Sequence, residues 1–558
     1  MSKNNLALLV VIETAMLGLV AMTMFGVLMD QYEKAQHAIA ERTAIARATE
    51  VFIALLTATP PTATPTASST ATPTFTATAT STPVPTRTAT PLDTATPSRT
   101  PTPSISPTPS RSPTPTLSPT PRPTRTPTTV PSNAIARCET IDNPGTYHLS
   151  ADLVANGECI VIKSSYVILD CAGHSIRGTN YTGYGIAIRK YGLLNAQTPA
   201  YVEVRNCRLS KFFYGIFVEA GTKLVIQGND SSNNFDDVDP VTRYGKFLGM
   251  TDGGGIRLNH TTDSQVLANK TLNQAIGIDV RYSSGIVVRN NIASNNSAWG
   301  INILRTTGSE VASNTTVDNV RKCTWGAGVV GFGCDAGGIV LQDGSSGNVV
   351  ANNSVTGRNG NGIFIKAHAM PCGNNNSILG NTITGALYNA VELSFCSGNR
   401  INNNQMRDSL DGIWLGFANN TEIKGNVIAN MRNHGIISAN SRHNTVSGNH
   451  IINSNEAIYF YSEEYDRREF SFLPPGDYTS HSNCLCGNTL QNNTIAIRLF
   501  DSTHNQVTGN TYINNGRNVL AQGRSDGNNI QGYAPFAPYV SLAMRLPRAL
   551  RPIDCTIQ

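Results

Sequence analysis

The sequence predicts an all-β solenoid over residues 134–532, and three observations support that interpretation. A Gly-Ile, Ala-Ile or Ala-Val pair recurs from Gly185 to Ala496, and most steps between successive pairs are 22 to 24 residues long. Asn after a small residue recurs alongside it, as in Gly425-Asn426. The residues between these markers form short runs with a period of two and show no helical periodicity. Repeats of this length are typical of solenoids.

The first segment of the chain predicts a membrane anchor. Residues 6–29 are an apolar run long enough to span a bilayer. No A-x-A-like cleavage site accompanies it, so we expect an uncleaved transmembrane helix over residues 1–29. Residues 30–56 have helical spacing and predict a juxtamembrane helix. The expected location is therefore the cell membrane, crossed once, with the solenoid extracellular or periplasmic.

Residues 57–133 predict a disordered stalk. This segment is nearly all Thr, Pro, Ala and Ser, a composition that cannot bury a core and stays extended. At ~3.1 Å per residue the stalk would reach roughly 200 Å, which is enough to carry a domain away from a membrane.

Charge argues against one class of partner. The formal net charge is +5 and charged residues make up 14% of the chain. No dense basic patch stands out, so we expect no binding to nucleic acid.

The content of each repeat predicts its path. Three strands of three to five residues, joined at Gly and Asn turns, would wind so that each strand lies on its counterpart in the next coil. The Asn after each small residue would then form a ladder at one bend. Residues 533–558 leave the repeat pattern, and we expect them to form a C-terminal cap or tail.

These repeats, with the segment 143–178, resemble the right-handed parallel β-helix family with NosD-type (CASH, pectate-lyase-like) repeats. The resemblance covers about residues 138–532 and implies a right-handed parallel β-helix of about 12–13 coils. The same fold serves pectin and alginate enzymes, tailspikes, adhesins and a copper-site maturation factor. It therefore does not fix a function.

The strand that begins with Gly-Ile predicts a binding face. Side chains alternate along a strand, so the residues two and four positions after Gly should point outward and form two columns. The columns bring together charged groups and aromatic rings, which are suited to hydroxyl groups and to the apolar faces of sugars. The predicted substrate-binding residues are Arg257, Phe364, Glu392, Trp414, Tyr459 and Tyr461. Longer loops at 230–253, 318–337 and 462–486 should wall this groove.

Two kinds of function remain open for such a groove. The first is a polysaccharide lyase or glycoside hydrolase, with Lys366 as base beside Arg281 and Asp279. Pectin hydrolases of this fold use an Asp pair followed closely by Gly-His-Gly. The similar residues here, Asp236-Asp237 and Asn433-His434-Gly435, lie almost nine coils apart, so that site cannot assemble. We expect His434 to be a turn residue. The second is a non-catalytic glycan-binding or scaffold protein.

Metal sites are a further expectation. Asp236, Asp237 and Asp239 lie in one acidic loop and could bind Ca²⁺. His368, Met370 and Cys372 are soft ligands at alternate positions, which a NosD-like copper-binding protein would use. The competing interpretation places Cys372 in a disulfide.

Cysteine positions predict disulfides in an extracytoplasmic domain. Cys323 and Cys334 bracket one inserted loop, and Cys372 and Cys396 precede consecutive coils. Cys171 and Cys207 should stack in neighbouring coils, either bonded or simply packed. Zinc binding is not expected, because paired C-x-x-C spacing is missing.

Overall fold

The computed structural model describes residues 132–531 except 193–195, 237–240, 243–244, 247–250, 322–334, 368–371, 466–472 and 474–475. The expected anchor, juxtamembrane helix, stalk and C-terminal cap lie outside these residues. No helix in the described part is long and apolar enough to cross a membrane.

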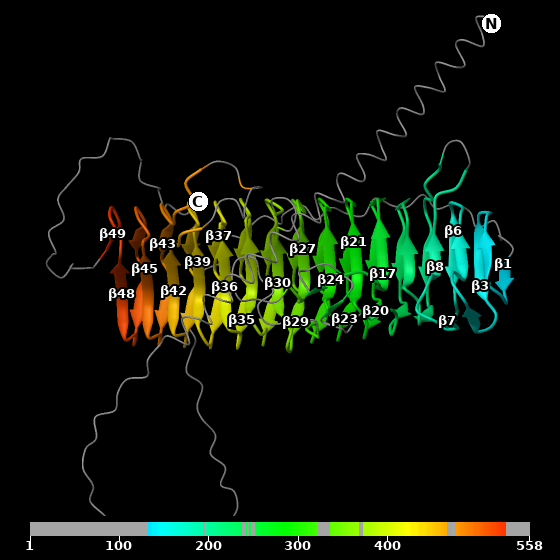
Figure 1. Ribbon diagram of the computed structural model, residues 1–558, viewed down its shortest axis with the longest axis horizontal. Helices are drawn as coiled ribbons and strands as arrows, with labels where there is room; N and C mark the ends of the chain where they lie inside the picture. Colours follow the sequence, from blue (N-terminus) through cyan, green and yellow to red (C-terminus); the bar gives the residue numbers. More distant parts are fainter. Residues whose placement is uncertain are drawn as a thin grey trace, which may run out of the picture. The chain divides into compact units, whose positions relative to one another are not determined.

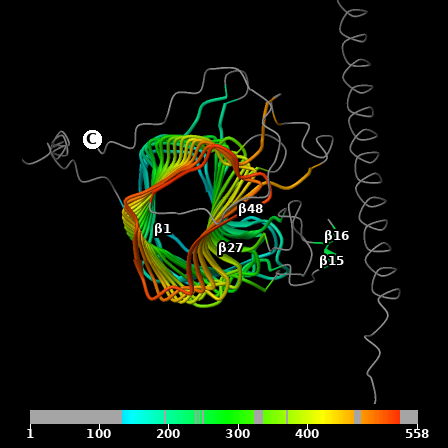
Figure 2. The same ribbon diagram turned by 90° about the vertical axis from the view of Figure 1, so that its left-hand side faces the viewer.

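The described chain winds into three long parallel sheets, which we call A, B and C. Sheet A has 16 strands from β1 (Ser132–Ile135) to β49 (Asn529–Ile530), and sheet C has 14 strands from β4 (Leu153–Ala155) to β47 (Thr511–Ile513). Each strand pairs with its counterpart one coil away, so the coils stack along one axis (Figures 1 and 2).

Sheet B has 15 strands and carries the predicted binding face. In order these are β2 (Glu139–Ile141), β5 (Ile160–Ile162), β8 (Tyr184–Ile188), β11 (Tyr214–Val218), β17 (Gly254–Asn259), β21 (Ile276–Arg281), β24 (Trp299–Leu304), β27 (Gly337–Gln342), β30 (Asn361–Lys366), β33 (Asn389–Ser394), β36 (Asp411–Gly416), β39 (His434–Ala439), β42 (Glu456–Tyr461), β45 (Ile495–Phe500) and β48 (Arg517–Gln522).

The helix has more coils than the 12–13 expected. The Gly-Ile markers identify the twelve strands from β8 to β45, but β2, β5 and β48 lack the marker and were missed. Coils at either end therefore share the winding without sharing the sequence signature.

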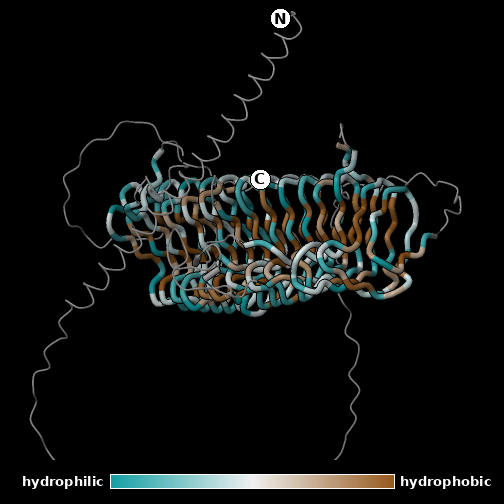
Figure 3. Tube along the Cα trace, turned by 45° about the vertical axis from the view of Figure 1, so that its right-hand side comes forward, coloured by the Kyte–Doolittle hydropathy of each residue, from teal (hydrophilic) through white to brown (hydrophobic). Residues whose placement is uncertain are grey.

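The core is a continuous column of Ile, Val and Leu inside the three sheets. In Figure 3 apolar segments lie in the strands, between two edges where the turns are mostly hydrophilic. The predicted Asn ladder stands at the bend between sheets A and C. For example, the backbone N and the Nδ2 of Asn404 donate to Asn426 Oδ1 at 2.9 and 3.0 Å, and Asn426 repeats this with Asn449. The ladder provides hydrogen-bond partners for buried polar groups of the turn that would otherwise have none.

Where two Asn residues are adjacent, we expected the first to form the ladder, but the second does. Asn290, Asn352 and Asn403 have left-handed backbones, with φ between 54° and 58°. They take the corner position that Gly425 holds in its own coil, at φ 66°. The following residues, Asn291, Asn353 and Asn404, form the ladder.

The recurrence of Gly immediately before Ile in this chain has a steric cause. A Cβ on Gly412 would lie 2.3 Å from the carbonyl oxygen of Gly435 and 2.7 Å from Ile428 Cγ2. The strand ladder also skips this Gly, since Asn389 pairs with Asp411 and Val391 with Ile413. Both strands have one residue at this unpaired position, so none is inserted, but the side chain of the residue before Gly lies on the outside of the sheet, where Asp411 contacts His434.

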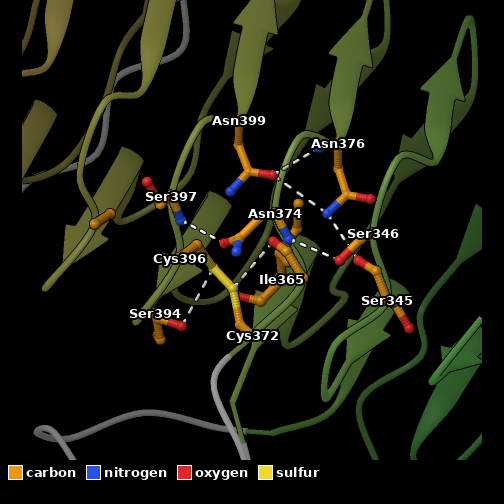
Figure 4. Close-up of a disulfide and its surroundings, with 12 residues drawn as sticks. Ser345, Ser346, Ile365, Cys372, Asn374, Asn376, Ser394, Cys396, Ser397 and Asn399 are labelled. Carbon is orange, nitrogen blue, oxygen red and sulfur yellow. Dashed lines mark hydrogen bonds between the residues drawn. A yellow bond between two sulfur atoms is a disulfide. The ribbon is translucent and has the colours of Figure 1, made fainter. Parts of the chain in front are cut away.

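Disulfides tie neighbouring coils together. Cys372 and Cys396 form the pair expected from their places before consecutive coils (Figure 4). Cys171 bonds to Cys207 and Cys138 to Cys159, also between neighbouring coils. The bond between Cys484 and Cys486 lies within the single strand β43 (Cys484–Cys486) and joins no coils. Cys323 and Cys334 lie outside the described residues.

Candidate functional site

The outer face of sheet B carries the two columns expected from the sequence. Equivalent residues of neighbouring strands are in register, such as Arg257 with Asp279, Phe364 with Glu392 and Glu392 with Trp414. The alternation rule therefore places these side chains on one face.

The expectation of an open groove along the whole face is wrong in its middle. Asp279 is fully buried, Phe364 is 5% exposed and Lys366 is 3% exposed. Asp252 and Asp335, from two of the loops expected to wall the groove, instead reach onto the face and pair with its cations. In the described part of these loops, Asp252 and Asp335 thus lie over this region of the face rather than beside it.

One set of charges under this cover is the Asp279 cluster, made of Tyr214, Asp252, Arg257, Asp279 and Arg281. Arg281 Nε lies 2.9 Å from both oxygens of Asp279, and Arg257 Nη1 donates to Asp252 Oδ1 at 2.5 Å. The Tyr214 hydroxyl lies 2.7 Å from Asp252 Oδ1 and 3.0 Å from Asp279 Oδ2.

The Asp279 cluster is electrostatically matched. Burial opposes ionisation of Asp279, but the guanidinium groups of Arg281 and Arg257 hold its pKa below the usual value. Asn302 Nδ2 also donates to Asp279 Oδ1 at 2.8 Å. Within this described cluster, no buried side-chain nitrogen or oxygen atom lacks a hydrogen-bond partner.

Lys366 lies three strands away from Asp279 along sheet B. Its Nζ is 3.3 Å from Asp335 Oδ2. The structure thus brings together two of the expected catalytic residues, Asp279 and Arg281, and places the third with a different partner.

A second charged cluster further along the face, beyond Glu392, is the His434 cluster, made of Asp411, His434, Glu456, Tyr459 and Arg498. His434 Nδ1 is 2.8 Å from Asp411 Oδ1, and its Nε2 faces Glu456 Oε2 at 3.7 Å. Arg498 Nη1 donates to Glu456 Oε1 at 3.0 Å. Asp411, His434 and Glu456 come from successive strands, so the chain of contacts runs along the helix axis.

Two polar atoms of the His434 cluster have no hydrogen-bond partner. They are Glu456 Oε2 and Arg498 Nε, and both are buried. Buried polar atoms without a partner cost stability.

Aromatic rings surround this cluster. The ring of Tyr459 stacks on Tyr461, with 4.8 Å between the centroids, and lies 5.6 Å from the His434 ring. The Arg498 guanidinium lies 4.7 Å from the centroid of the Tyr459 ring. The indole of Trp414 occupies the space above Gly416, where a Cβ would come within 2.1 Å of it. Trp414, Tyr459 and Tyr461 are half-buried.

Sequence reasoning missed a third outward column, which includes Tyr214, Asp411, His434 and Glu456. Each precedes the Gly or Ala of its strand, where strict alternation predicts an inward side chain. His434 lies within β39 and is not the turn residue that the sequence suggested. The signal available was the Gly itself, because the strand ladder is interrupted there and regular alternation does not extend to the preceding residue.

The residues expected to bind metals are differently engaged. Asp236 forms an ion pair with Arg321, and Asp237 and Asp239 lie outside the described residues. The sulfur of Cys372 is bound in a disulfide, so it is no thiolate donor for copper. His368 and Met370 also lie outside the description. In the part of the chain that is described, no group of three or more His, Cys, Asp or Glu side chains is arranged to hold a metal ion.

Comparison with known proteins gives two matching family models. One is described as a right-handed beta helix region and matches residues 152–319 and 251–377. The other is described as a periplasmic copper-binding protein (NosD) and matches residues 367–531. The chain has no match among curated proteins.

Several solved structures are similar at low identity. A mutant of the periplasmic alginate epimerase AlgG is 14% identical, with 68% of this chain and 79% of that chain covered and a TM-score of 0.39. The A-module of the Azotobacter vinelandii mannuronan C-5 epimerase AlgE4 is 14% identical, with 70% and 91% covered and a TM-score of 0.39. A mutant tailspike protein of E. coli bacteriophage HK620 is 11% identical, with 66% and 71% covered and a TM-score of 0.42.

The two family models together span the coils from residue 152 to residue 531, and the three sheets stack as such models require. The chain belongs to the right-handed parallel β-helix family with NosD-type repeats.

Proposed function

We propose that this protein binds polysaccharide on the outer face of sheet B, between β36 and β45. One observation carries the proposal: three half-buried aromatic rings, Trp414, Tyr459 and Tyr461, lie beside the incompletely bonded charges of the His434 cluster. Aromatic rings receive the apolar face of a sugar, while Arg498, whose side chain is 29% exposed, can donate to its hydroxyl groups.

The proposed binding face differs from the sequence-based one in extent. Trp414, Tyr459 and Tyr461 remain in it, whereas Arg257 and Phe364 lie in the covered middle. Asp279, Arg281 and Lys366 have partners there that occupy them, so we do not assign catalysis to that set. The disulfides support an oxidising location outside the cytoplasm, and we retain the anchor at 1–29 and the Thr/Pro-rich stalk as part of the proposal.

Binding is tested by electrophoresis of the protein through gels containing one soluble polysaccharide each, neutral or uronic. We expect retardation by at least one polymer and roughly tenfold weaker binding in Trp414→Ala and Tyr459→Ala, since a stacked ring contributes about 1 kcal/mol or more. Tyr166→Ala is the matched control, because that ring is 60% exposed in the turn before β6 (Val167–Asp170). Equal losses in all three variants would contradict the proposed site.

A second candidate function, acid–base cleavage of the bound glycan, is favoured by the contact between Asp411 and His434. A carboxylate on Nδ1 fixes the imidazole and leaves Nε2 to exchange a proton with substrate. The test follows unsaturated ends by near-ultraviolet absorbance and new reducing ends with the retained polysaccharide. Product lost in His434→Gln, with retardation unchanged, would support cleavage. No product from the parent protein would leave a binding protein.

A further inference from the structure

The covered middle of sheet B holds a lysine in a place where lysines are rarely found. The Lys366 side chain is 3% exposed, and its Nζ lies 3.3 Å from Asp335 Oδ2, on a side chain that is 17% exposed. Lys residues are almost never fully buried unless paired. Because the amine and the carboxyl are held in contact and away from solvent, they meet the first requirement for a reaction between them.

The surroundings of this pair are apolar. Lys366 Nζ is 5.5 Å from the centroid of the Phe364 ring. Phe364 packs in a buried cluster on the outside of the sheet with Trp299, Ala336 and Val340. In such surroundings an ion pair loses solvation that its mutual attraction repays only in part. A neutral product would not carry that cost.

A third group, Glu392, completes the arrangement. It pairs in register with Phe364, and its Oε2 accepts from Asn389 Nδ2 at 2.7 Å while Ser394 Oγ donates to Oε1 at 3.2 Å. Burial raises the pKa of the Glu392 carboxyl to about 7, the charge of Asp335 adds to this, and Lys366 opposes it. Glu392 therefore exchanges a proton readily near neutral pH.

We propose that Lys366 and Asp335 condense to an intramolecular isopeptide bond, with Glu392 as the group that transfers protons. Lys366 Nζ attacks Asp335 Cγ, so that an N–C bond forms and one Cγ–O bond breaks. The ammonium gives up two protons in the course of the reaction, and both leave on the departing carboxyl oxygen as water. Glu392 takes a proton from the nitrogen and returns one to the oxygen, and it ends unchanged. No oxidant or other reactant is needed.

The bond would join the residue that follows the segment 322–334 to the last residue of β30. Asp335 and Lys366, which are far apart in sequence, would then be held together covalently. The disulfide of Cys372 and Cys396 forms a separate covalent link a few residues further on. The proposal does not depend on the glycan-binding function.

Peptide mass spectrometry of the full chain tests the proposal. After reduction, alkylation and digestion, we expect a branched peptide that contains both Lys366 and Asp335 and is lighter by one water than its two parts. The parts at their full masses, with no linked peptide, would overturn the proposal, and so would loss of water at another position.

Variants identify the groups that act. Lys366→Arg and Asp335→Ala remove a reactant and should yield no linked peptide. Glu392→Gln keeps the size of the side chain but cannot exchange the proton, and the linked fraction should fall at least tenfold. An unchanged linked fraction in Glu392→Gln would remove Glu392 from the proposal. Lys270 and Asp230 serve as an internal control, because they form a pair of similar length (3.4 Å) at 50% and 40% exposure and should remain unlinked.

Discussion

The Asp279 cluster and the His434 cluster lie on the same face of the same sheet, yet they are built for different purposes. The first has two acids and two arginines bonded to each other, and its buried polar atoms are all partnered. The second has a similar set of charges but leaves Glu456 Oε2 and Arg498 Nε without a hydrogen bond. The composition of the two clusters would not separate them. Completeness of bonding does: it indicates a structural role for the first, whereas the second is the one for which a ligand is proposed.

The largest expected effect on stability comes from a substitution that breaks the Asp279 cluster. In Asp279→Ala, Arg281 and Arg257 would face each other without their shared carboxylate, so the free energy of unfolding should fall by about 3–5 kcal/mol. Guanidinium unfolding measures this. Asp230→Ala, which removes the exposed partner of Lys270, should cost less than about 1 kcal/mol. Similar small losses in both variants would remove the structural role assigned to the Asp279 cluster.

A pH dependence follows from Glu392, which lies between the two clusters. Its pKa is raised from 4.5 to about 7 in the folded protein, so the folded state holds a proton that the unfolded state has released. The free energy of unfolding should therefore be highest below pH 4.5 for this group and decline as the pH rises to about 7, by on the order of 3 kcal/mol. Unfolding curves at several pH values check this against Glu392→Gln, in which that decline should be absent.

Ser438 tests whether an unpartnered atom costs stability where no ligand is expected. It faces the core between Leu415 and Phe460, and its hydroxyl has no partner. Ser438→Ala should raise the free energy of unfolding by about 1 kcal/mol. Ser441→Ala should lower it by a similar amount, because Ser441 Oγ accepts from the Ala418 amide and donates to the Ala439 carbonyl. A loss of stability in Ser438→Ala would show that this unpartnered buried hydroxyl does not destabilise the fold.

The smallest expected effect on stability is that of Glu456→Gln. The amide keeps the acceptor for Arg498 and removes a charge that is only partly satisfied, so we expect a change below about 1 kcal/mol in guanidinium unfolding. Retardation by the bound polysaccharide should nonetheless weaken. Stability lost without any change in retardation would assign the His434 cluster to the same structural role as the Asp279 cluster.

The sequence predicted the sheets, the ladder and the two outward columns because each depends on a local repeat. Arg257, Asp279 and Arg281 could be grouped in advance for the same reason. Burial of the middle of the face was not predictable, since it depends on where Asp252 and Asp335 reach from longer loops whose path no repeat constrains. The third column was missed because the strand ladder is interrupted at Gly, and the period-two alternation that located the first two columns does not hold across that position.

The Asn ladder also bears on how such a chain changes in evolution. Each ladder Asn is bonded to the equivalent Asn one coil away on either side, as Asn426 is to Asn404 and Asn449, and its amide also donates to a backbone carbonyl, as Asn426 Nδ2 does to Ile401. Removing or duplicating a complete coil would bring two equivalent Asn residues together and restore the same bonds across the junction. An insertion of a few residues has no such solution and must leave the wall as a loop. Length can therefore vary in whole coils, while new surface features arise from the fractions of a coil that do not fit.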